Sequence, residues 1–185
     1  MALGVLNNIS TTFAEDNLNQ TQASLQTVLQ QLSSGSRIHS GADDNASVVR
    51  SILEAAHVVG KALKDGKATG CYLFAAFTAE ESGLIGSSRF VDLLRKRHIH
   101  PKAMLNLDMV GRLTANSLLV FGADTATEWQ RIVKRNCDSE RLGCRAGGGG
   151  YGASDHMPFY LARVPVLHFF TGTHSDYHRP SDTVD

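Results

Sequence analysis

The feature that most constrains the fold is an alternation of apolar runs with helix-like segments from residue 38 onward. Short apolar runs suit buried strands, whereas apolar side chains that recur every three or four residues suit amphipathic helices. Strands and helices that alternate in this way predict an α/β fold. The expected helices cover residues 46–63, 87–97, 126–136 and 156–163, and the expected strands cover residues 69–78, 102–111, 117–122 and 164–172.

The first 37 residues differ in composition from the rest of the chain. They are rich in asparagine and glutamine, contain no lysine, and have Arg37 as their single arginine. Leu18, Leu25 and Leu32 recur every seven residues, the narrow stripe of a helix that packs against a partner helix. An ordinary amphipathic surface helix is the alternative. We expect one domain in residues 1–37, ended by the turn-forming "SSGSR", and a second in residues 38–185.

The sequence of this first segment is similar to that of a known protein family. The run "DNLNQTQASLQTVLQQLSSGSRI" followed by "SGADD" closely resembles the N-terminal segment of bacterial flagellin. In flagellins this segment pairs with a C-terminal helix of the same chain, whereas this chain ends at "RPSDTVD". The resemblance therefore implies that the leucine stripe packs on the rest of the chain or on another copy, as in a homo-oligomer. It also implies a chimera or a fragment.

Charge and hydropathy exclude several classes of partner. The chain has 18 basic and 18 acidic residues, so it offers no electrostatic case for binding nucleic acid or an anionic membrane. It contains no apolar run of about 18 residues, so no membrane span is expected. The N-terminus lacks the layout of a cleaved secretory signal. Cys71 is expected in the core, and Cys137 and Cys144 could pair if the chain is exported.

Acidic and imidazole side chains follow or border the predicted strands and tight turns. Because open α/β sheets place their sites at strand ends, these groups are expected to gather in one cleft, where a cation or proton must offset the carboxylates. A mixture of Asp, Glu and His suits zinc. Individually, each group has an ordinary explanation as a turn cap, a helix N-terminal charge or an exposed histidine. The candidates are Asp43, Glu80, Glu81, Asp108 and His178.

Five separated motifs resemble, in the same order, the zinc-dependent aminopeptidases with two co-catalytic zincs. The motifs are "GADDNAS", "FAAFTAEESGLIGS", "NLDMVGR", "ASDHMPF" and "YHRPSDT". The resemblance covers about residue 38 to the C-terminus. It implies a three-layer α/β core with a mixed, mostly parallel sheet, here truncated and preceded by a long N-terminal helix. It also implies hydrolysis of N-terminal peptide bonds, with free-amino peptides as substrates and a secreted or periplasmic location.

The same resemblance assigns roles to individual residues. Asp43 matches the carboxylate that bridges both zincs, and Glu81 and His178 complete one zinc site. Asp108 matches a ligand of the other zinc. Glu80 matches the general base, which takes a proton from water and passes it to the leaving amine.

Four further positions match substrate-binding or stabilising parts of the family site. Tyr177 matches a phenol that stabilises the tetrahedral intermediate in some members. Asp155 and His156 match the segment that lines the substrate cleft. Tyr151, after the glycine run 147–150, would lie on a flexible cleft rim, and a loose surface loop is the alternative.

The chain also departs from the family pattern. The zinc-binding histidine that precedes the "GADD" aspartate has no match, the early strands and final helix are absent, and Val48 replaces a glycine. His39 is a candidate substitute ligand. We therefore expect at most one tightly bound zinc per chain. The alternatives are a catalytically impaired zinc-binding protein that oligomerises through its N-terminal helix, a single-zinc acyl transferase like glutaminyl cyclase and, least favoured, a flagellar filament role.

Overall fold

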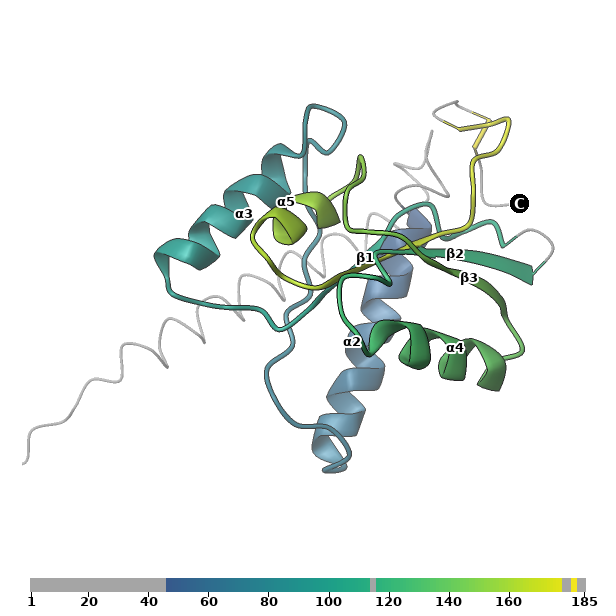
Figure 1. Ribbon diagram of the computed structural model, residues 1–185, viewed down its shortest axis with the longest axis horizontal. Coiled ribbons are helices and arrows are strands. Elements are labelled where there is room, and N and C mark those ends of the chain that lie inside the picture. Colours follow the sequence, from purple (N-terminus) through teal and green to yellow (C-terminus); the bar gives the residue numbers. More distant parts are fainter. Residues whose placement is uncertain (1–45, 114–115, 178–180, 183–185) are drawn as a thin grey trace, which may run out of the picture. The chain divides into compact units, whose positions relative to one another are not determined.

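The structure is a computed structural model that describes residues 46–113, 116–177 and 181–182 (Figure 1). All of these residues belong to one compact unit, residues 40–185. The predicted boundary at residues 37 and 38, and the N-terminal helix, lie outside the described residues. The elements are α2 (Ser47–Lys64), α3 (Ile85–Lys96), β1 (Met104–Leu107), β2 (Ser117–Phe121), α4 (Trp129–Ser139), β3 (Gly143–Gly147), α5 (His156–Leu161) and β4 (Val166–Phe170).

The four strands form one mixed sheet in the order β1-β4-β2-β3. Strand β1 runs parallel to β4 and places Asn106 opposite His168. Strand β2 runs parallel to β3 and antiparallel to β4. Two of the three pairings are therefore parallel, which confirms the predicted mixed, mostly parallel sheet.

Helices cover both faces of the sheet. Because successive side chains of a strand point to opposite faces, adjacent residues of β4 enter two separate hydrophobic clusters. Val166 packs with Val91 of α3 and Phe159 of α5, whereas Leu167 packs with Val133 of α4. Figure 1 shows α3 and α5 on one side of the strands and α4 on the other. This arrangement confirms the predicted three-layer core.

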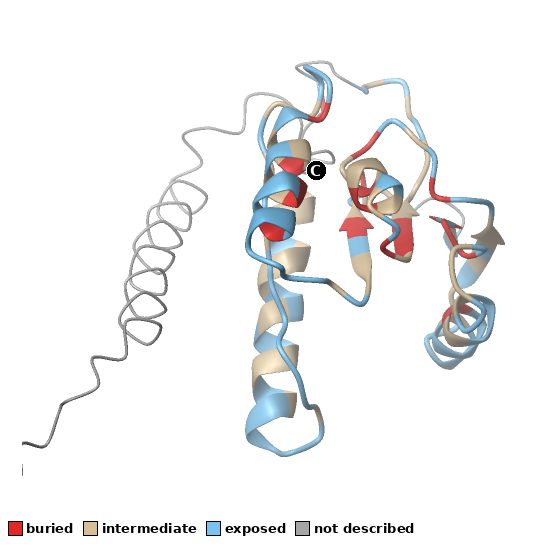
Figure 2. Ribbon diagram, turned by 60° about the vertical axis from the view of Figure 1, so that its left-hand side comes forward, coloured by how far each residue is buried: buried red, intermediate tan, exposed pale blue. Residues whose placement is uncertain are grey.

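The four helices predicted from apolar spacing are all present, with boundaries that shift by a few residues. Buried residues gather on α3, on α5 and in the strands, whereas α2 has none (Figure 2). No helix within the described ranges is long and apolar enough to cross a lipid bilayer.

One predicted strand is wrong. Residues 69–78 have no strand assignment, and Tyr72, Leu73 and Phe74 are exposed. A strand is defined by its ladder of hydrogen bonds, and no described strand pairs with this segment, so its apolar composition alone does not make it one. Cys71, which we expected in the core, is exposed for the same reason. The end of the segment is anchored through Phe77, which packs on the cluster around Phe159.

Strand β3 was missed because its glycines hide the apolar alternation that marks a strand. Gly143 lies where a Cβ atom would come within 2.7 Å of the carbonyl oxygen of Asn116, so the neighbouring chain requires a glycine there. The glycine run that we expected as a loose rim thus begins inside the sheet, since Gly147 pairs with Phe121.

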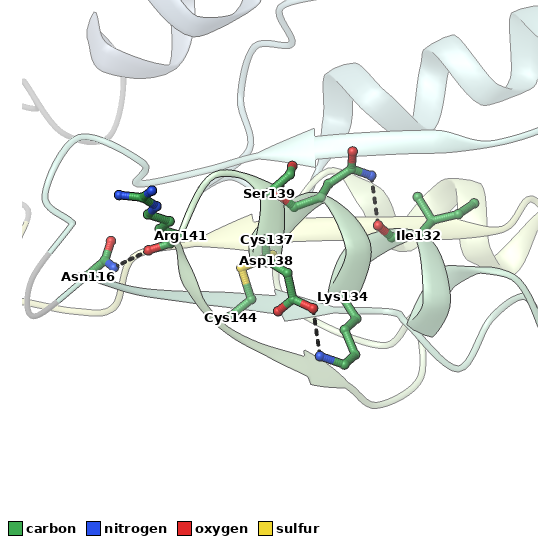
Figure 3. Close-up of a disulfide and its surroundings, with 9 residues drawn as sticks. Asn116, Ile132, Lys134, Cys137, Asp138, Ser139, Arg141 and Cys144 are labelled. Carbon is green, nitrogen blue, oxygen red and sulfur yellow. Dashed lines mark hydrogen bonds and ion pairs between the residues drawn. A yellow bond between two sulfur atoms is a disulfide. The ribbon is translucent and has the colours of Figure 1, made fainter.

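A disulfide joins Cys137 of α4 to Cys144 of β3, with Cα atoms 6.1 Å apart (Figure 3). The side chain of Asn116 donates a 2.7 Å hydrogen bond to the carbonyl oxygen of Arg141, in the turn between the two cysteines. Both cysteines pack against the cluster of Val120, Val133 and Leu167. The pairing of Cys137 with Cys144, which the sequence left undecided, is therefore present, and it fixes α4 to the edge of the sheet.

The interior also contains two histidines that stack on each other. His156, at the start of α5, is 1% exposed, and His168, in the middle of β4, is 9% exposed. Their ring centroids are 4.5 Å apart and their planes differ by 10°. Burial lowers the pKa of both rings, that of His156 to about 4, because the charged form loses its hydration.

We predict that removing the disulfide destabilises the fold without changing it. The disulfide joins two cysteines that are seven positions apart and so restricts the unfolded chain. Because Cys137→Ser restores this conformational entropy to the unfolded chain, it should lower the free energy of unfolding by about 2–3 kcal/mol. Urea unfolding without reductant measures the change. Cys71→Ser, which removes an exposed free thiol, is the control and should match wild type. Equal stability of the two variants would contradict the prediction.

We also predict that acid destabilises the fold through His156. Between about pH 6.5 and 4 the unfolded chain takes up a proton at this residue that the folded chain does not, so the free energy of unfolding falls as the pH falls. The slope is at most about 1.4 kcal/mol per pH unit for this one group. His156→Leu removes the titration and should show a smaller loss of stability between pH 7 and pH 4.5 in urea unfolding.

The control for the acid experiment is His57→Gln, which replaces an exposed histidine of α2. It should lose as much stability as wild type over the same pH interval. An unchanged pH dependence in His156→Leu would show that this buried ring does not contribute.

Candidate active site

Asp108 lies directly after β1, at the carboxyl end of the strand, where open α/β sheets place their sites. Its amide donates a 3.2 Å hydrogen bond to the carbonyl oxygen of Phe169 on the parallel strand β4. One residue later, the carbonyl oxygen of Met109 accepts a 3.0 Å hydrogen bond from the amide of Thr171. The segments that follow the two strands therefore remain joined beyond the sheet, and Asp108 is fixed between them.

A chain of hydrogen bonds orients the Asp108 carboxylate. The Ser154 hydroxyl donates to its Oδ2 over 2.7 Å, and the Asn106 side-chain amide donates to the Ser154 hydroxyl, also over 2.7 Å. The same amide nitrogen lies 3.0 Å from Nδ1 of His168. Because an amide nitrogen only donates, Nδ1 accepts, and the neutral imidazole carries its proton on Nε2. Buried Asn106, Ser154 and His168 thus hold one carboxylate oxygen in place.

A second carboxylate lies close to Asp108. Asp155 is half-buried, and its Oδ1 has no hydrogen-bond partner among the described residues. Burial and the negative charge of Asp108 raise the pKa of Asp155, and a hydrogen bond from Ser87 opposes this shift. The negative charge of Asp108 therefore disfavours the ionised form of Asp155, and a cation beside the two carboxyl groups would be favourable.

His156 and Tyr151 differ in accessibility. His156 is buried, and neither ring nitrogen has a hydrogen-bond partner among the described residues. A Cβ atom at Gly152 would lie 2.9 Å from its Nε2, so any other residue at this position would require the His156 ring to shift. Tyr151 is 73% exposed and its ring meets Tyr160 edge-on at 5.0 Å. A substrate contact stays a prediction for both: Tyr151 is accessible to a substrate, whereas His156 is buried.

Glu80 and Glu81 lie in a tight turn just before α3. The carbonyl oxygen of Glu80 accepts hydrogen bonds from the amides of Gly83 and Leu84, at 3.0 and 2.8 Å. Leu84 has a positive φ of 58°, an uncommon conformation for a residue with a side chain, which marks a turn held by its surroundings. Glu80 is half-buried and Glu81 is exposed. The roles of general base for Glu80 and zinc ligand for Glu81 stay predictions.

Tyr177, the predicted stabilising phenol, is 40% exposed in the segment that follows β4. Its amide donates a 3.2 Å hydrogen bond to the carbonyl oxygen of His174. Asp43, His178 and the candidate substitute His39 lie outside the described residues. Of the four predicted zinc ligands, the structure thus describes Glu81 and Asp108, and among the described residues no group of three or more His, Cys, Asp or Glu could hold a metal.

Three residues of this site were not predicted from the sequence: Asn106, Ser154 and His168. The signal for His168 was a lone histidine in the apolar run "VPVLHFFTG". Polar side chains inside a buried strand need partners, and here the partner is Asn106 on the adjacent strand. Asn106 and Ser154 lay within quoted motifs, next to residues whose charge drew attention.

Comparison with known proteins identifies the family of this chain. Residues 19–185 match the peptidase family M28. Aminopeptidase YwaD of Bacillus subtilis (strain 168) is 32% identical over 158 residues, covering 78% of this chain and 33% of that protein. Leucine aminopeptidase 1 of Uncinocarpus reesii is 32% identical over 162 residues, covering 78% of this chain and 40% of its own length.

A solved structure gives the same result. BSAP, a zinc aminopeptidase from Bacillus subtilis, superposes with a TM-score of 0.59 at 30% sequence identity, over 79% of this chain and 37% of its own. The chain therefore spans about a third to two-fifths of the length of these relatives. Because the family match covers residues 19–185, which include every helix and strand described above, the chain belongs to peptidase family M28.

Proposed function

We propose that this chain is a zinc aminopeptidase, which hydrolyses the N-terminal peptide bond of substrates with a free amino group. The observation that carries the proposal is the Asp108 carboxylate, held by Ser154 and Asn106 at the carboxyl end of β1 and accompanied by Asp155. Membership of peptidase family M28 and similarity to proteins named aminopeptidases support the same reaction.

The donor set fits zinc. Asp43, Glu81 and His178 would hold one ion, and Asp108 would contribute with Asp43 to a second, weaker site that lacks its histidine. Carboxylates and imidazole are ordinary zinc ligands, and the serine bonded to Asp108 is the kind of outer partner that orients a ligating carboxylate. When bound, zinc supplies Lewis acidity, which polarises a carbonyl group and lowers the pKa of water.

The chain's own residues supply the proton transfers and the orientation of the substrate. Glu80 takes a proton from the attacking water and delivers it to the leaving amine, as a general base and then a general acid. Tyr177, whose ring is partly exposed, donates a hydrogen bond to the oxygen on which negative charge develops. Asp155, which lies near Asp108, and the exposed Tyr151 contact the substrate.

A second candidate is a catalytically impaired zinc-binding protein that assembles through its N-terminal helix. The missing histidine and the leucine stripe of Leu18, Leu25 and Leu32 favour it. The family match begins at residue 19, inside the segment that resembles flagellin, so the flagellin-like origin and the chimera stay predictions.

We predict that Glu80→Gln removes aminopeptidase activity while zinc binding stays intact. Glutamine cannot accept the proton, and general-base catalysis contributes about 10²–10⁴-fold, so turnover of an aminoacyl chromogenic amide should fall by that factor. Zinc-loaded full-length protein and elemental analysis give the two readouts. Glu54→Gln, which changes an exposed acid of α2, is the matched control and should keep wild-type turnover.

Equal turnover in wild type and Glu80→Gln would contradict the assignment of the base. Wild-type protein that binds zinc without turning over any amide of the panel would favour the second candidate.

We also predict that one zinc per chain is tightly bound and depends on Glu81. Glu81→Gln removes a ligand of the complete site and should weaken zinc binding by more than about 100-fold, beyond the usual cost of an outer-shell change. Asp108→Asn affects the weaker site and should leave the tight zinc in place. Competition with a chromogenic chelator measures both. Two firmly held zincs per chain would show that a substitute ligand, such as His39, exists.

A further inference from the structure

The segment that follows β4 is tied to the segment that follows β1 by one arginine. Arg112 Nη2 donates a 3.0 Å hydrogen bond to Oδ1 of Asp182, and its Nη1 lies 3.5 Å from Oδ2 of Asp176. Asp182 is 2% exposed, so its charge is almost completely removed from water and needs a fixed cation beside it. The two carboxylates lie six positions apart in the sequence, and a single guanidinium group contacts both.

Further hydrogen bonds join residues 174–176 and residues 181–182, which lie at the two ends of the loop that carries Tyr177. The Ser181 hydroxyl donates to Oδ1 of Asp176 over 2.8 Å, which joins the two ends of the loop directly. The amide of Asp176 donates to Nδ1 of His174 over 3.2 Å, and Nε2 of His174 lies 3.9 Å from Oδ1 of Asp182. The residues on both sides of 177–180 are therefore fixed to one another and to Arg112.

This loop is also connected to the segment that carries Asp108. The backbone bonds from Asp108 to Phe169 and from Thr171 to Met109 already join the segments after β1 and β4. Arg112 extends this connection three residues beyond Met109. The base of the loop that carries Tyr177 is thus held against the strand segment that carries Asp108.

We propose that Arg112 is a positioning residue that holds Tyr177, the residue before His178 in the sequence, in place for the reaction. The inference rests on the proposed function, in which Tyr177 stabilises developing charge and His178 binds zinc. Arg112 acts through Asp176 and Asp182, which precede and follow Tyr177 and His178 in the sequence. The planar guanidinium contacts two carboxylates at once, which a lysine ammonium does less well.

The test uses Arg112→Met in the full-length protein, since methionine keeps much of the side-chain length and removes the charge. We expect kcat to fall by about 10–100-fold and zinc affinity by about tenfold, as for other outer-shell changes, with KM within about twofold of wild type. We also expect chymotrypsin to cleave after Tyr177 about tenfold faster, because the loop loses its charge-assisted hydrogen bonds. Arg112→Lys should recover part of each effect.

Two further variants keep the test interpretable. Arg112→Met removes the guanidinium group beside the buried Asp182 carboxylate, and this loss destabilises the fold as well as the loop. Asp176→Ala removes only the more exposed end of the cluster, together with its bond from Ser181, and should show the same pattern more weakly in a folded protein. Arg131→Met, at an exposed arginine of α4, should match wild type in every readout.

The outcomes separate this inference from the proposed function. Unchanged cleavage after Tyr177 in both Arg112→Met and Asp176→Ala would overturn the role of Arg112. Faster cleavage with unchanged kcat and zinc affinity would overturn the positioning role. If wild type does not hydrolyse amides, the proposed function fails by itself, and the zinc affinity and the cleavage rate after Tyr177 then decide whether Arg112 positions this loop.

Discussion

The parallel pairing of β1 with β4 is the interaction on which the rest of the structure depends. It places Asn106 opposite His168, and its continuation beyond the sheet joins Asp108 to Phe169. A shift of one residue in this register would turn every side chain of β1 to the other face and separate the amide from the imidazole. The register is fixed by the core, because Val166 and Leu167 must enter different hydrophobic clusters.

The polar groups at the end of this pairing are costly to bury, and they therefore favour one specific arrangement of the chain. Leaving a buried donor or acceptor without its partner costs about 1–3 kcal/mol, so Asn106, Ser154 and His168 favour the one arrangement in which each is satisfied. Asp155 and His156 do not follow this rule, since each keeps a buried polar atom without a partner among the described residues. Unsatisfied groups next to a satisfied network are typical of sites that receive a ligand.

The elements that follow from the spacing of apolar residues could be predicted from the sequence. Those that depend on which strands pair with each other could not. All four helices followed from apolar spacing, and the apolar runs that became β1, β2 and β4 were recognised. Residues 69–78 had the composition of a strand but no described partner, whereas Gly143–Gly147 had a partner without the composition. Asp108 was found because of its charge, while neutral Asn106 and Ser154 gave no comparable signal.

The hydrogen bonds of the candidate site join residues that are distant in the sequence. Asn106 and Ser154 are 48 positions apart, Asn106 and His168 are 62 apart, and Arg112 and Asp182 are 70 apart. None of these contacts forms from local structure, so the orientation of Asp108 exists only once β1, α5 and β4 have assembled. Substitutions in the hydrophobic clusters therefore act on the site through the sheet, and stability and site geometry change together in this chain.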